Sequence, residues 1–205
     1  MKVSRRLAER RVAHVRESTV RPEWPRRTNG RAGAGYAPAV TAERPEIRYR
    51  RPTEADYRAI VTVVNDWWGG RPIDVLLPRL WLQHFTRTSW VGESDTGRLA
   101  GFLVGFLSPD RPAEAYCHLV AANPNLRRMG IGSELYERFF ADGRAGGRTR
   151  VVAVTWPGNR VAIAFHRALG FEPEAGPGTQ NLYGTPAYPA YDAEREDRTV
   201  LVRSL

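Results

Sequence analysis

An apolar segment that leads through a glycine-containing turn into an amphipathic helix constrains this chain more than any other feature. Residues 115–122 have the composition of a buried strand. Gly130 and Gly132 follow it, and the apolar residues from 131 to 139 then repeat at the spacing of one helical face. A helix that begins after such a turn offers free backbone N–H groups and the positive end of its dipole to an anion. We therefore expect an anion site at this junction.

Two arginines beside the glycines indicate what kind of anion binds. Glycine lets the backbone approach phosphate oxygens without a Cβ in the way, and Arg127 and Arg128 add positive charge. The turn lacks the Lys-Ser/Thr pair that ends a Walker loop and the third glycine of the dinucleotide fingerprint. A pyrophosphate ligand is expected, and the NTPase and Rossmann interpretations are weakened. Two glycines alone, however, are more often a tight turn or a helix cap.

The apolar pattern places further strands and helices around this junction. A first helix is expected after Thr53, which forms an approximate capping box with Asp56, and a second one from Leu77 to Phe85. The expected strands cover residues 47–50, 89–92, 99–107, 115–122, 150–156 and 199–203, and the other helices cover residues 131–140 and 161–169. The order β-α-α-β-β-β-α-β-α-β predicts an α/β fold, in which about four helices flank a central mixed, twisted sheet.

The positive charge of the chain is concentrated before this pattern begins. Residues 1–44 hold eleven basic residues and four glutamates, and therefore carry seven of the nine net positive charges. This stretch is rich in arginine, proline and glycine, a composition that cannot bury enough apolar surface to fold alone. We expect a flexible N-terminal arm at residues 1–44 and one folded domain at residues 45–205. A solvated extension is the simplest interpretation of the arm, so beyond weak anion contacts a nucleic-acid partner is not expected.

Cysteine content and hydropathy argue against a disulfide-bonded, zinc-binding, membrane-spanning or secreted protein. Cys117 is the only cysteine, so an internal disulfide is excluded, and we interpret it as a small core residue. The four histidines do not form a zinc-ligand spacing with it, and no metal is expected. No apolar stretch reaches the roughly 18 residues of a membrane span, and the N-terminus lacks an apolar signal region. We expect a cytoplasmic protein without a membrane partner, and the sequence leaves a homodimer open.

The residues around the glycine turn resemble the central motif of the GNAT family of N-acetyltransferases. That motif is Arg/Gln-x-x-Gly-x-Gly/Ala after a strand and an Asn/His-Pro turn, and residues 119–133 match it. Residues 159–171, with the pattern Asn-x-x-Ala-x-x-Phe-His-x-x-x-Gly-Phe, resemble the second family motif. The resemblance as a whole covers roughly residues 46–171 and, more loosely, the C-terminal strand, and residues 1–44 have no counterpart in the family. The resemblance implies a GNAT-like fold and an enzyme that transfers the acetyl group of acetyl-CoA to a primary amine.

The resemblance also implies which residues bind acetyl-CoA. In the family, the strand before the turn pairs with the pantetheine arm, the amides of the turn hold the pyrophosphate, and an asparagine of the second motif lies beside the pantetheine. The corresponding residues here are Val120, Ala121, Ala122, Arg127, Arg128, Met129, Gly130, Ile131, Gly132, Ser133 and Asn159.

Candidates for the proton transfers come from the same comparison. Direct attack of an amine on the thioester needs a neutral amine, a polarised carbonyl and a proton for the departing thiolate, and no nucleophilic serine or cysteine. His166 occupies the position where many family members have the tyrosine that protonates the thiolate, and histidine can also donate a proton. Glu114 and His118 are candidates for the general base, directly or through water. Strand alternation would place Tyr116 and His118 on one face with Val120. A structural role stays open for all three candidates.

The acceptor is expected to be a small-molecule or peptide amine. Family members build the acceptor pocket from the first two helices and a late loop, which here correspond to residues 65–71 and 172–197. Both segments combine aromatic residues with a carboxylate, which suits a cationic amine, although core or interface packing is the more frequent role of tryptophan side chains. Residues 172–197 show no obvious helix or strand and are interpreted as a lid or as disordered. The alternative function is a non-catalytic acyl-CoA-binding regulatory module that has kept the pyrophosphate turn.

Overall fold

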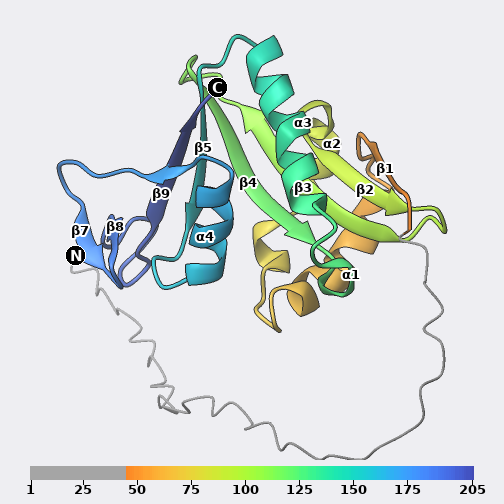
Figure 1. Ribbon diagram of the computed structural model, residues 1–205, viewed down its shortest axis with the longest axis horizontal. Coiled ribbons are helices and arrows are strands. Elements are labelled where there is room, and N and C mark those ends of the chain that lie inside the picture. The colour runs from red at the N-terminus through yellow and green to blue at the C-terminus, as the bar shows by residue number, and fades with distance from the viewer. Residues whose placement is uncertain (1–44) are drawn as a thin grey trace, which may run out of the picture. The chain divides into compact units, whose positions relative to one another are not determined.

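A seven-stranded mixed sheet organises residues 45–205, the part of the chain that the computed structural model describes (Figure 1). The predicted arm at residues 1–44 lies outside the described residues. The strands are β1 (Ile47–Arg50), β2 (Trp90–Ser94), β3 (Leu99–Leu107), β4 (Glu114–Ala122), β5 (Arg150–Thr155), β6 (Glu172–Pro173), β7 (Gln180–Leu182), β8 (Thr185–Ala187) and β9 (Thr199–Ser204). The helices are α1 (Asp56–Trp67), α2 (Trp81–His84), α3 (Ile131–Ala145) and α4 (Arg160–Ala168), with short 3₁₀ turns η1 (Asp74–Leu76), η2 (Thr86–Thr88) and η3 (Pro124–Leu126).

The strand order of the main sheet is β1-β2-β3-β4-β5-β9-β6, and β7 and β8 form a separate hairpin. Neighbouring strands of the main sheet are antiparallel except β4 and β5, which are parallel. A parallel pair needs a crossover connection, and α3 supplies it. The centre of the sheet therefore contains a strand, a turn and a helix in sequence, as the glycine pattern predicts.

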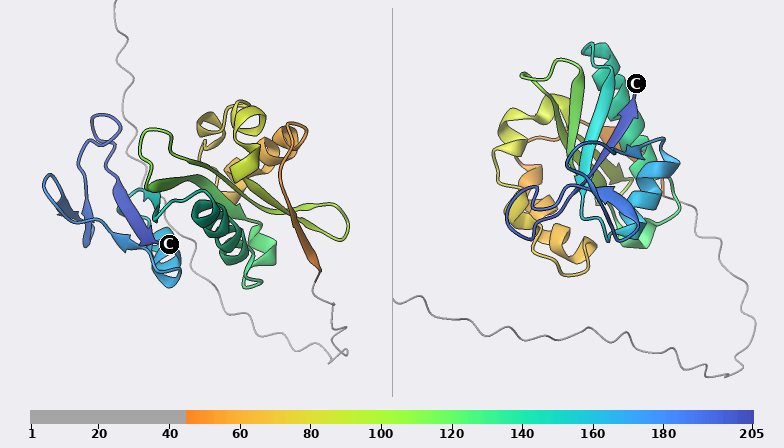
Figure 2. Two further views of the ribbon diagram at one scale, coloured as in Figure 1. Left: turned by 90° about the horizontal axis from the view of Figure 1, so that it is seen from above. Right: turned by 90° about the vertical axis from the view of Figure 1, so that its left-hand side faces the viewer.

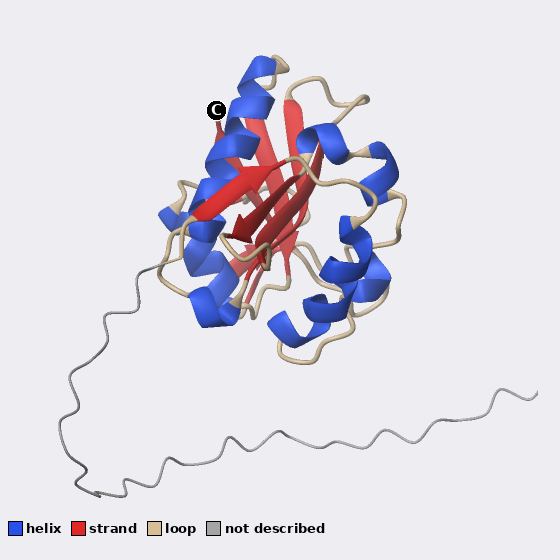
Figure 3. Cartoon of the chain, turned by 90° about the vertical axis from the view of Figure 1, so that its right-hand side faces the viewer, coloured by secondary structure: helices blue, strands red, loops and turns tan. Residues whose placement is uncertain are grey.

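The helices cover the two faces of the sheet (Figures 2 and 3). On one face, Leu135 and Phe139 of α3 lie in a buried cluster with residues of β3, β4, β5 and β9. On the other face, Ile60 and Val64 of α1 pack against β2 and β3. Full burial of each such side chain contributes about 1.5–3 kcal/mol. These two clusters fix α3 and α1 on opposite sides of β4.

A glycine of β3 lets the first turn of α3 approach the sheet closely. A Cβ at Gly101 would lie 2.7 Å from Cγ2 of Ile131 and 2.9 Å from the carbonyl oxygen of Ala121. Any larger residue would therefore push the beginning of α3 away from β4. The absence of a side chain at this position sets the distance between the glycine turn and the strand.

The predicted order of major elements is confirmed, but the second helix is shorter than predicted. Only Trp81–His84 is helical, whereas the prediction covered Leu77 to Phe85. Leu77 precedes Pro78, which disfavours a helical backbone at the residue before it, and Leu77 has φ −121° and ψ 61°. Its side chain is nevertheless fully buried, so the apolar periodicity reflected packing rather than a continuous helix.

Two further predictions of local structure differ from the fold. α1 begins at Asp56. The carboxylate of Asp56 accepts hydrogen bonds from the backbone N–H of Thr53 (2.6 Å) and from the hydroxyl of Thr53 (3.1 Å). The N–H of Asp56 bonds to the carbonyl oxygen of Thr53 and not to its hydroxyl, so only half of the predicted capping box forms. Residues 172–197 are neither featureless nor disordered, because they contain β6 and the β7–β8 hairpin. A bridge between Tyr188 and Arg198 then returns the chain to β9.

Candidate active site

The central parallel strands separate halfway along their length. β4 pairs with β5 from Glu114 to Cys117, and from His118 to Ala122 it has no strand partner on that side. β5 continues to Thr155 beside β9. The backbone N–H and C=O groups of β4 along this stretch therefore face an opening between the strands, where an extended ligand that contains amide groups can pair with them.

The glycine turn closes one end of this opening. Arg128 and Gly130 have left-handed backbone conformations, with φ of 65° and 74°, and α3 begins at the next residue. The N–H groups of Ile131, Gly132 and Ser133 have no acceptor within the helix. Alternating backbone conformations of this kind form concave anion sites, and the helix dipole strengthens them. Arg127 and Arg128 are exposed beside the turn.

These features meet in one cavity of about 560 Å³. Most of the predicted site residues line it, namely His118, Val120, Ala121, Ala122, Arg127, Arg128, Gly130, Ile131, Gly132, Ser133, Asn159 and His166. Met129 and Glu114 do not. Met129 packs instead against the buried cluster beneath α3. The cavity thus brings together the beginning of α3 with its free N–H groups, an open strand edge and two histidines.

Asn159 has a structural role at the cavity wall. Its Oδ1 accepts a hydrogen bond from the N–H of Ala162 (3.2 Å), so it is the N-cap of α4. Its Nδ2 lies 3.4 Å from Oγ1 of Thr155, a long contact that leaves this donor available to a ligand. One side chain therefore fixes the start of α4 and presents an amide to the cavity.

His166 is buried on α4 and hydrogen bonded through both ring nitrogens. Its Nδ1 lies 2.7 Å from the carbonyl oxygen of Ala162, and its Nε2 lies 2.7 Å from the hydroxyl of Tyr136. Because a carbonyl can only accept, Nδ1 carries the proton of the neutral ring and Nε2 accepts from Tyr136. Burial lowers the pKa of His166 from its ordinary value, which favours this neutral form.

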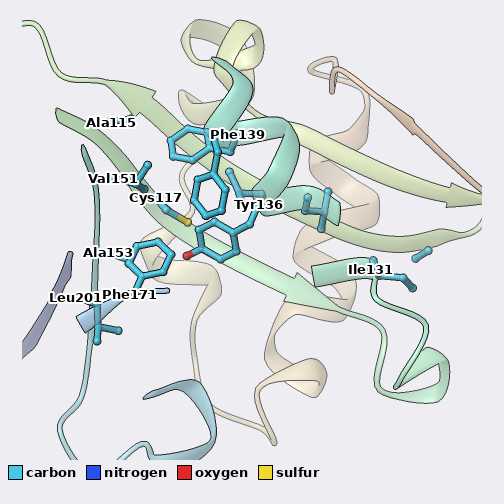
Figure 4. Close-up of a cluster of buried hydrophobic side chains, with 13 residues drawn as sticks. Ala115, Cys117, Ile131, Tyr136, Phe139, Val151, Ala153, Phe171 and Leu201 are labelled. Carbon is cyan, nitrogen blue, oxygen red and sulfur yellow. The ribbon is translucent and has the colours of Figure 1, made fainter. Parts of the chain in front are cut away.

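Tyr136 and Cys117 continue this buried polar chain across the bottom of the cavity. Both line it, and Figure 4 shows the Tyr136 ring beside the Cys117 sulfur. Burial raises the pKa of the Tyr136 hydroxyl well above its ordinary value and that of the Cys117 thiol to about 12. The thiol is therefore protonated at neutral pH, which agrees with a core residue rather than a nucleophile.

His118 and Val120 lie on opposite faces of β4. Val104 of β3 pairs with Leu119 and Gly105 pairs with Cys117, so His118 is the extra residue of a β-bulge. The bulge breaks the alternation. His118 stacks on Trp81 of α2 (4.2 Å between ring centroids), whereas Val120 packs on the α3 side. The prediction that His118 and Val120 share a face is therefore wrong.

The hydrogen bond of His118 also fixes its tautomer. Nε2 lies 2.7 Å from the carbonyl oxygen of Leu76, which can only accept, so Nε2 carries the proton and Nδ1 is the basic nitrogen. Burial lowers the pKa of His118, although the bond to Leu76 raises it somewhat. A neutral imidazole with a free lone pair at the cavity wall can accept a proton.

Glu114 lies at the beginning of β4, away from the separated ends of the strands. Its buried carboxylate forms ion pairs with Arg150 and, at 3.5 Å, with Arg111. The structure does not bring it together with the two histidines. We therefore withdraw it as a candidate base, since two arginines already neutralise it outside the cavity.

Tyr136 and Trp68 are among the cavity residues that the sequence analysis did not predict as site residues. Tyr136 follows Gly132 by one helical turn and resembles any other aromatic residue of the buried face of α3, so only its partner His166 distinguishes it. Trp68 follows the last residue of α1 and also lines the cavity. The sequence places Trp68 within residues 65–71, which were predicted to contribute to the acceptor pocket, but it does not distinguish this residue from its neighbours.

The segment predicted as a lid presents aromatic and acidic side chains. The ring centroids of Tyr188 and Tyr191 lie 6.0 Å apart, and the hydroxyl of Tyr188 donates a hydrogen bond to the carboxylate of Glu174 (2.8 Å). Arg198 pairs with Asp192 and Glu196, both at 2.7 Å. None of these six residues lines the cavity. Their part in acceptor binding stays a prediction.

Within residues 45–205, no cluster of three or more histidine, cysteine, aspartate or glutamate side chains is arranged to hold a metal ion. None of the helices in the same range has the length and hydropathy needed to cross a membrane.

Comparison with known proteins identifies similar sequences. The model of the acetyltransferase (GNAT) family matches residues 52–171. The chain is 30% identical over 110 residues to the L-2,4-diaminobutyric acid acetyltransferase of Nocardia farcinica, an alignment that covers 54% of this chain and 56% of that protein. The chain thus spans just over half the length of this relative. It is also 29% identical over 133 residues to the L-methionine sulfoximine/L-methionine sulfone acetyltransferase of Pseudomonas aeruginosa, covering 58% of this chain and 76% of that protein.

Solved structures show the same fold. The phosphinothricin acetyltransferase of Sinorhizobium meliloti in complex with acetyl-CoA superposes with a TM-score of 0.57 over 78% of this chain and 88% of that chain, at 20% identity. At this identity the similarity concerns the fold alone.

Proposed function

The chain belongs to the GNAT acetyltransferase family, and we propose that it transfers the acetyl group of acetyl-CoA to the primary amine of a small, amino-acid-like molecule by direct attack, without a covalent enzyme intermediate. The observation that carries this proposal is a cavity that joins the beginning of α3 to the open edge of β4. It combines an anion site and a line of free backbone groups with two histidines that have different protonation patterns.

Acetyl-CoA fits the chemistry of this cavity. Its pyrophosphate needs N–H donors and positive charge, which the turn at residues 127–133 offers. The amides of its pantetheine arm need a strand edge, and β4 from His118 to Ala122 offers one. Asn159 adds a side-chain donor. Together these groups orient the thioester toward the end of the cavity that contains the histidines.

His118 is the proposed general base. Its Nδ1 carries a lone pair, because the proton of the ring is held on Nε2 by Leu76. The lowered pKa of His118 keeps this nitrogen unprotonated at neutral pH. It accepts the proton that the amine loses as its nitrogen attacks the thioester carbonyl, directly or through a water molecule.

His166 is the proposed source of the proton for the departing thiolate. It occupies the buried end of the cavity on α4, and its ring is fixed by Ala162 and Tyr136. The two histidines thus separate the roles of base and acid on different elements, β4 and α4.

The acceptor class rests on the relatives. Two of them are named for the amino acid or amino acid analogue that they acetylate, and a third, 26% identical, is named a phosphinothricin N-acetyltransferase. We therefore place L-2,4-diaminobutyrate, methionine sulfoximine and phosphinothricin first among the acceptors to test. Identification of the N-acetylated product by mass spectrometry measures the reaction, and acetylation of peptides alone would contradict this acceptor class.

A binding comparison tests the proposed site for acetyl-CoA. Acetyl-pantetheine lacks the nucleotide and the pyrophosphate, so it should bind more weakly than acetyl-CoA. Replacing Arg127 and Arg128 by alanine should reduce this difference, because it removes charge beside the phosphates. Arg144→Ala is the matched control, since Arg144 is exposed at the other end of the same helix. Equal affinity of the wild-type protein for both ligands would contradict the site.

A further inference from the structure

The loop between α1 and α2 contains the hydrogen-bond acceptor that determines the state of His118. Nε2 of His118 donates to the carbonyl oxygen of Leu76, 2.7 Å away, and the ring stacks on Trp81 with 13° between the ring planes. Stacking fixes the plane of the imidazole, but a half-turn about the Cβ–Cγ bond keeps that plane and exchanges the two edges of the ring. The bond to Leu76 therefore decides which nitrogen carries the proton and where Nδ1 points.

The direction of the Leu76 carbonyl is set on the other side of the same peptide unit. In a planar trans peptide, the C=O of Leu76 and the N–H of Leu77 point in opposite directions. This N–H donates to the carbonyl oxygen of Asp74 (3.0 Å), and the N–H of Leu76 donates to that of Ile73 (2.9 Å). The two bonds form the turn η1. A movement of Asp74 would therefore rotate the peptide unit that faces His118.

Asn65, in the last turn of α1, holds η1 through one side chain. Its Oδ1 accepts hydrogen bonds from the N–H groups of Ile73 (2.8 Å) and Asp74 (2.9 Å), and its Nδ2 donates to the carboxylate of Asp74 (2.8 Å). Two N–H groups that converge on one atom require the amide oxygen at that place, so the orientation of the amide is fixed. The backbone carbonyl of Asn65 also accepts from the N–H of Gly70 (2.8 Å). Asn65 therefore ties both the beginning of the loop and η1 to α1.

Packing of the loop does not replace these hydrogen bonds. The side chains of Val75 and Leu76 are 71% and 47% exposed, so they do not anchor η1. Leu77 is fully buried in the cluster that includes Val64 of α1. Apolar burial has no direction, however, whereas a hydrogen bond does. Leu77 thus holds the loop close to α1, and Asn65 sets the orientation of its backbone.

We propose that Asn65 is a positioning residue for His118, which it holds through η1 in the tautomer and orientation of a general base; this assignment rests on the proposed acetyltransferase function. With the Leu76 carbonyl in place, Nδ1 takes one proton from the attacking amine, and the imidazolium that forms keeps its Nε2–H on Leu76. With that carbonyl turned away, both tautomers and both edges of the ring become accessible. Only a fraction of the molecules would then present Nδ1 as the base.

Kinetics of Asn65→Ala test the assignment. Asn65 does not line the cavity, so KM for acetyl-CoA should change little. The turn is freed, so kcat should fall about 10- to 100-fold, as expected for a base displaced by up to about 1 Å. The assay is thiol release from acetyl-CoA with L-2,4-diaminobutyrate, methionine sulfoximine or phosphinothricin, whichever is acetylated fastest.

Ile60→Val is the matched control for a general loss of stability. Ile60 is a fully buried residue of the same helix, and it does not line the cavity. Its substitution should lower the thermal midpoint of unfolding but keep kcat within about threefold of the wild type. An unchanged kcat in Asn65→Ala, or an equal loss of kcat in Ile60→Val, would overturn the proposal.

Exchanging the side chains of Asn65 and Asp74 provides a rescue. Asn65→Asp removes the Nδ2 donor and places a second carboxylate beside Asp74, so kcat should fall. Asp74→Asn alone keeps an acceptor oxygen for Asn65 and should be nearly as active as the wild type. In the double variant the amide donor comes from residue 74, and all three hydrogen bonds form again with the two side chains reversed. It should recover most of the wild-type kcat; a double variant as slow as Asn65→Asp would contradict the positioning role.

A nuclear magnetic resonance measurement without substrates does not depend on turnover. The Nε2–H signal of His118 should be visible in a ¹H–¹⁵N spectrum of the wild type, because the bond to Leu76 slows its exchange with water. Its absence from His118→Gln identifies the signal. Asn65→Ala should lose it and Ile60→Val should keep it, whereas an unchanged signal in Asn65→Ala would overturn the proposal. If these spectra are as expected but no amine is acetylated, the proposed function fails while the connection from Asn65 to His118 stands.

Discussion

Substituting Gly132 by alanine tests how closely α3 and α4 approach each other at the cavity. A Cβ at this position would lie 2.9 Å from Cζ and 3.3 Å from Cε2 of Phe165, whereas carbon atoms in contact prefer about 3.5–4.0 Å. Phe165 in turn packs against Tyr136 and His166, with centroid distances of 6.0 and 5.4 Å, so its ring cannot move freely. Overpacking of this kind costs about 1–3 kcal/mol, and the better helix propensity of alanine offsets roughly 0.5–1 kcal/mol of it. We expect the free energy of unfolding to fall by about 1–2 kcal/mol.

The assay is urea unfolding together with titration of acetyl-CoA. Affinity for acetyl-CoA should also fall, because the displaced Phe165 is part of the cavity wall. Gly176→Ala is the matched control, since a Cβ there meets nothing within 4 Å; it should be neutral or stabilising by up to about 1 kcal/mol. Adding Phe165→Leu to Gly132→Ala should restore part of the lost stability. If Gly132→Ala unfolds and binds acetyl-CoA like the wild type, α3 and α4 do not approach as described.

Three further predictions concern stability and the withdrawn base. Asn159→Ala should lower the free energy of unfolding by about 1 kcal/mol in a urea titration, because the N-cap of α4 is lost. Asn159→Ser should keep most of the wild-type stability, because serine can also cap a helix. Equal losses of stability in the two variants would exclude the cap. Burial alone would raise the pKa of Asp56, but hydrogen bonds from Arg50 and Thr53 lower it below its ordinary value. The ionised carboxylate therefore stabilises the fold above the unfolded-state pKa of about 3.9. This stabilisation is lost as the pH falls through the folded-state pKa. Urea unfolding across the acid range should show this loss, and Arg50→Gln should reduce it. Glu114→Gln should destabilise the fold through Arg150 without a large change in kcat; a loss of kcat alone would restore Glu114 as a candidate base.

Much of the fold was predictable because strong local signals agree with the tertiary structure. The apolar strand, the glycines and the periodicity of α3 each impose a backbone shape that packing then preserves. The second helix was not predictable from periodicity, since Pro78 constrains Leu77 while burial still selects an apolar side chain there. Similarly, β6 depends on pairing with β9, which is distant in sequence, whereas β7 and β8 pair with each other but are too short to show a clear alternation.

The limits of the predicted site have specific physical causes. The glycine turn and the start of α3 were predictable because they are local backbone features. The face of His118 was not, since one extra residue in a β-bulge reverses the alternation and is determined by pairing with β3. Tyr136 was not recognised either, because a buried tyrosine on an apolar helix face has the same sequence pattern whether or not its hydroxyl has a partner. Glu114 illustrates the opposite case, a strand carboxylate that two arginines neutralise outside the cavity.

The central claim is that this cavity transfers the acetyl group of acetyl-CoA to an amine, and the release of free thiol from acetyl-CoA measures it most directly. The initial rate should rise strongly above the rate without acceptor for at least one amine in a panel of amino acids, polyamines, aminoglycosides and peptide N-termini. Binding of acetyl-CoA, followed by the thermal stability of the protein, serves as the parallel control. If acetyl-CoA stabilises the fold but no amine accelerates thiol release, the claim of an enzyme is contradicted and a non-catalytic acyl-CoA-binding module is favoured.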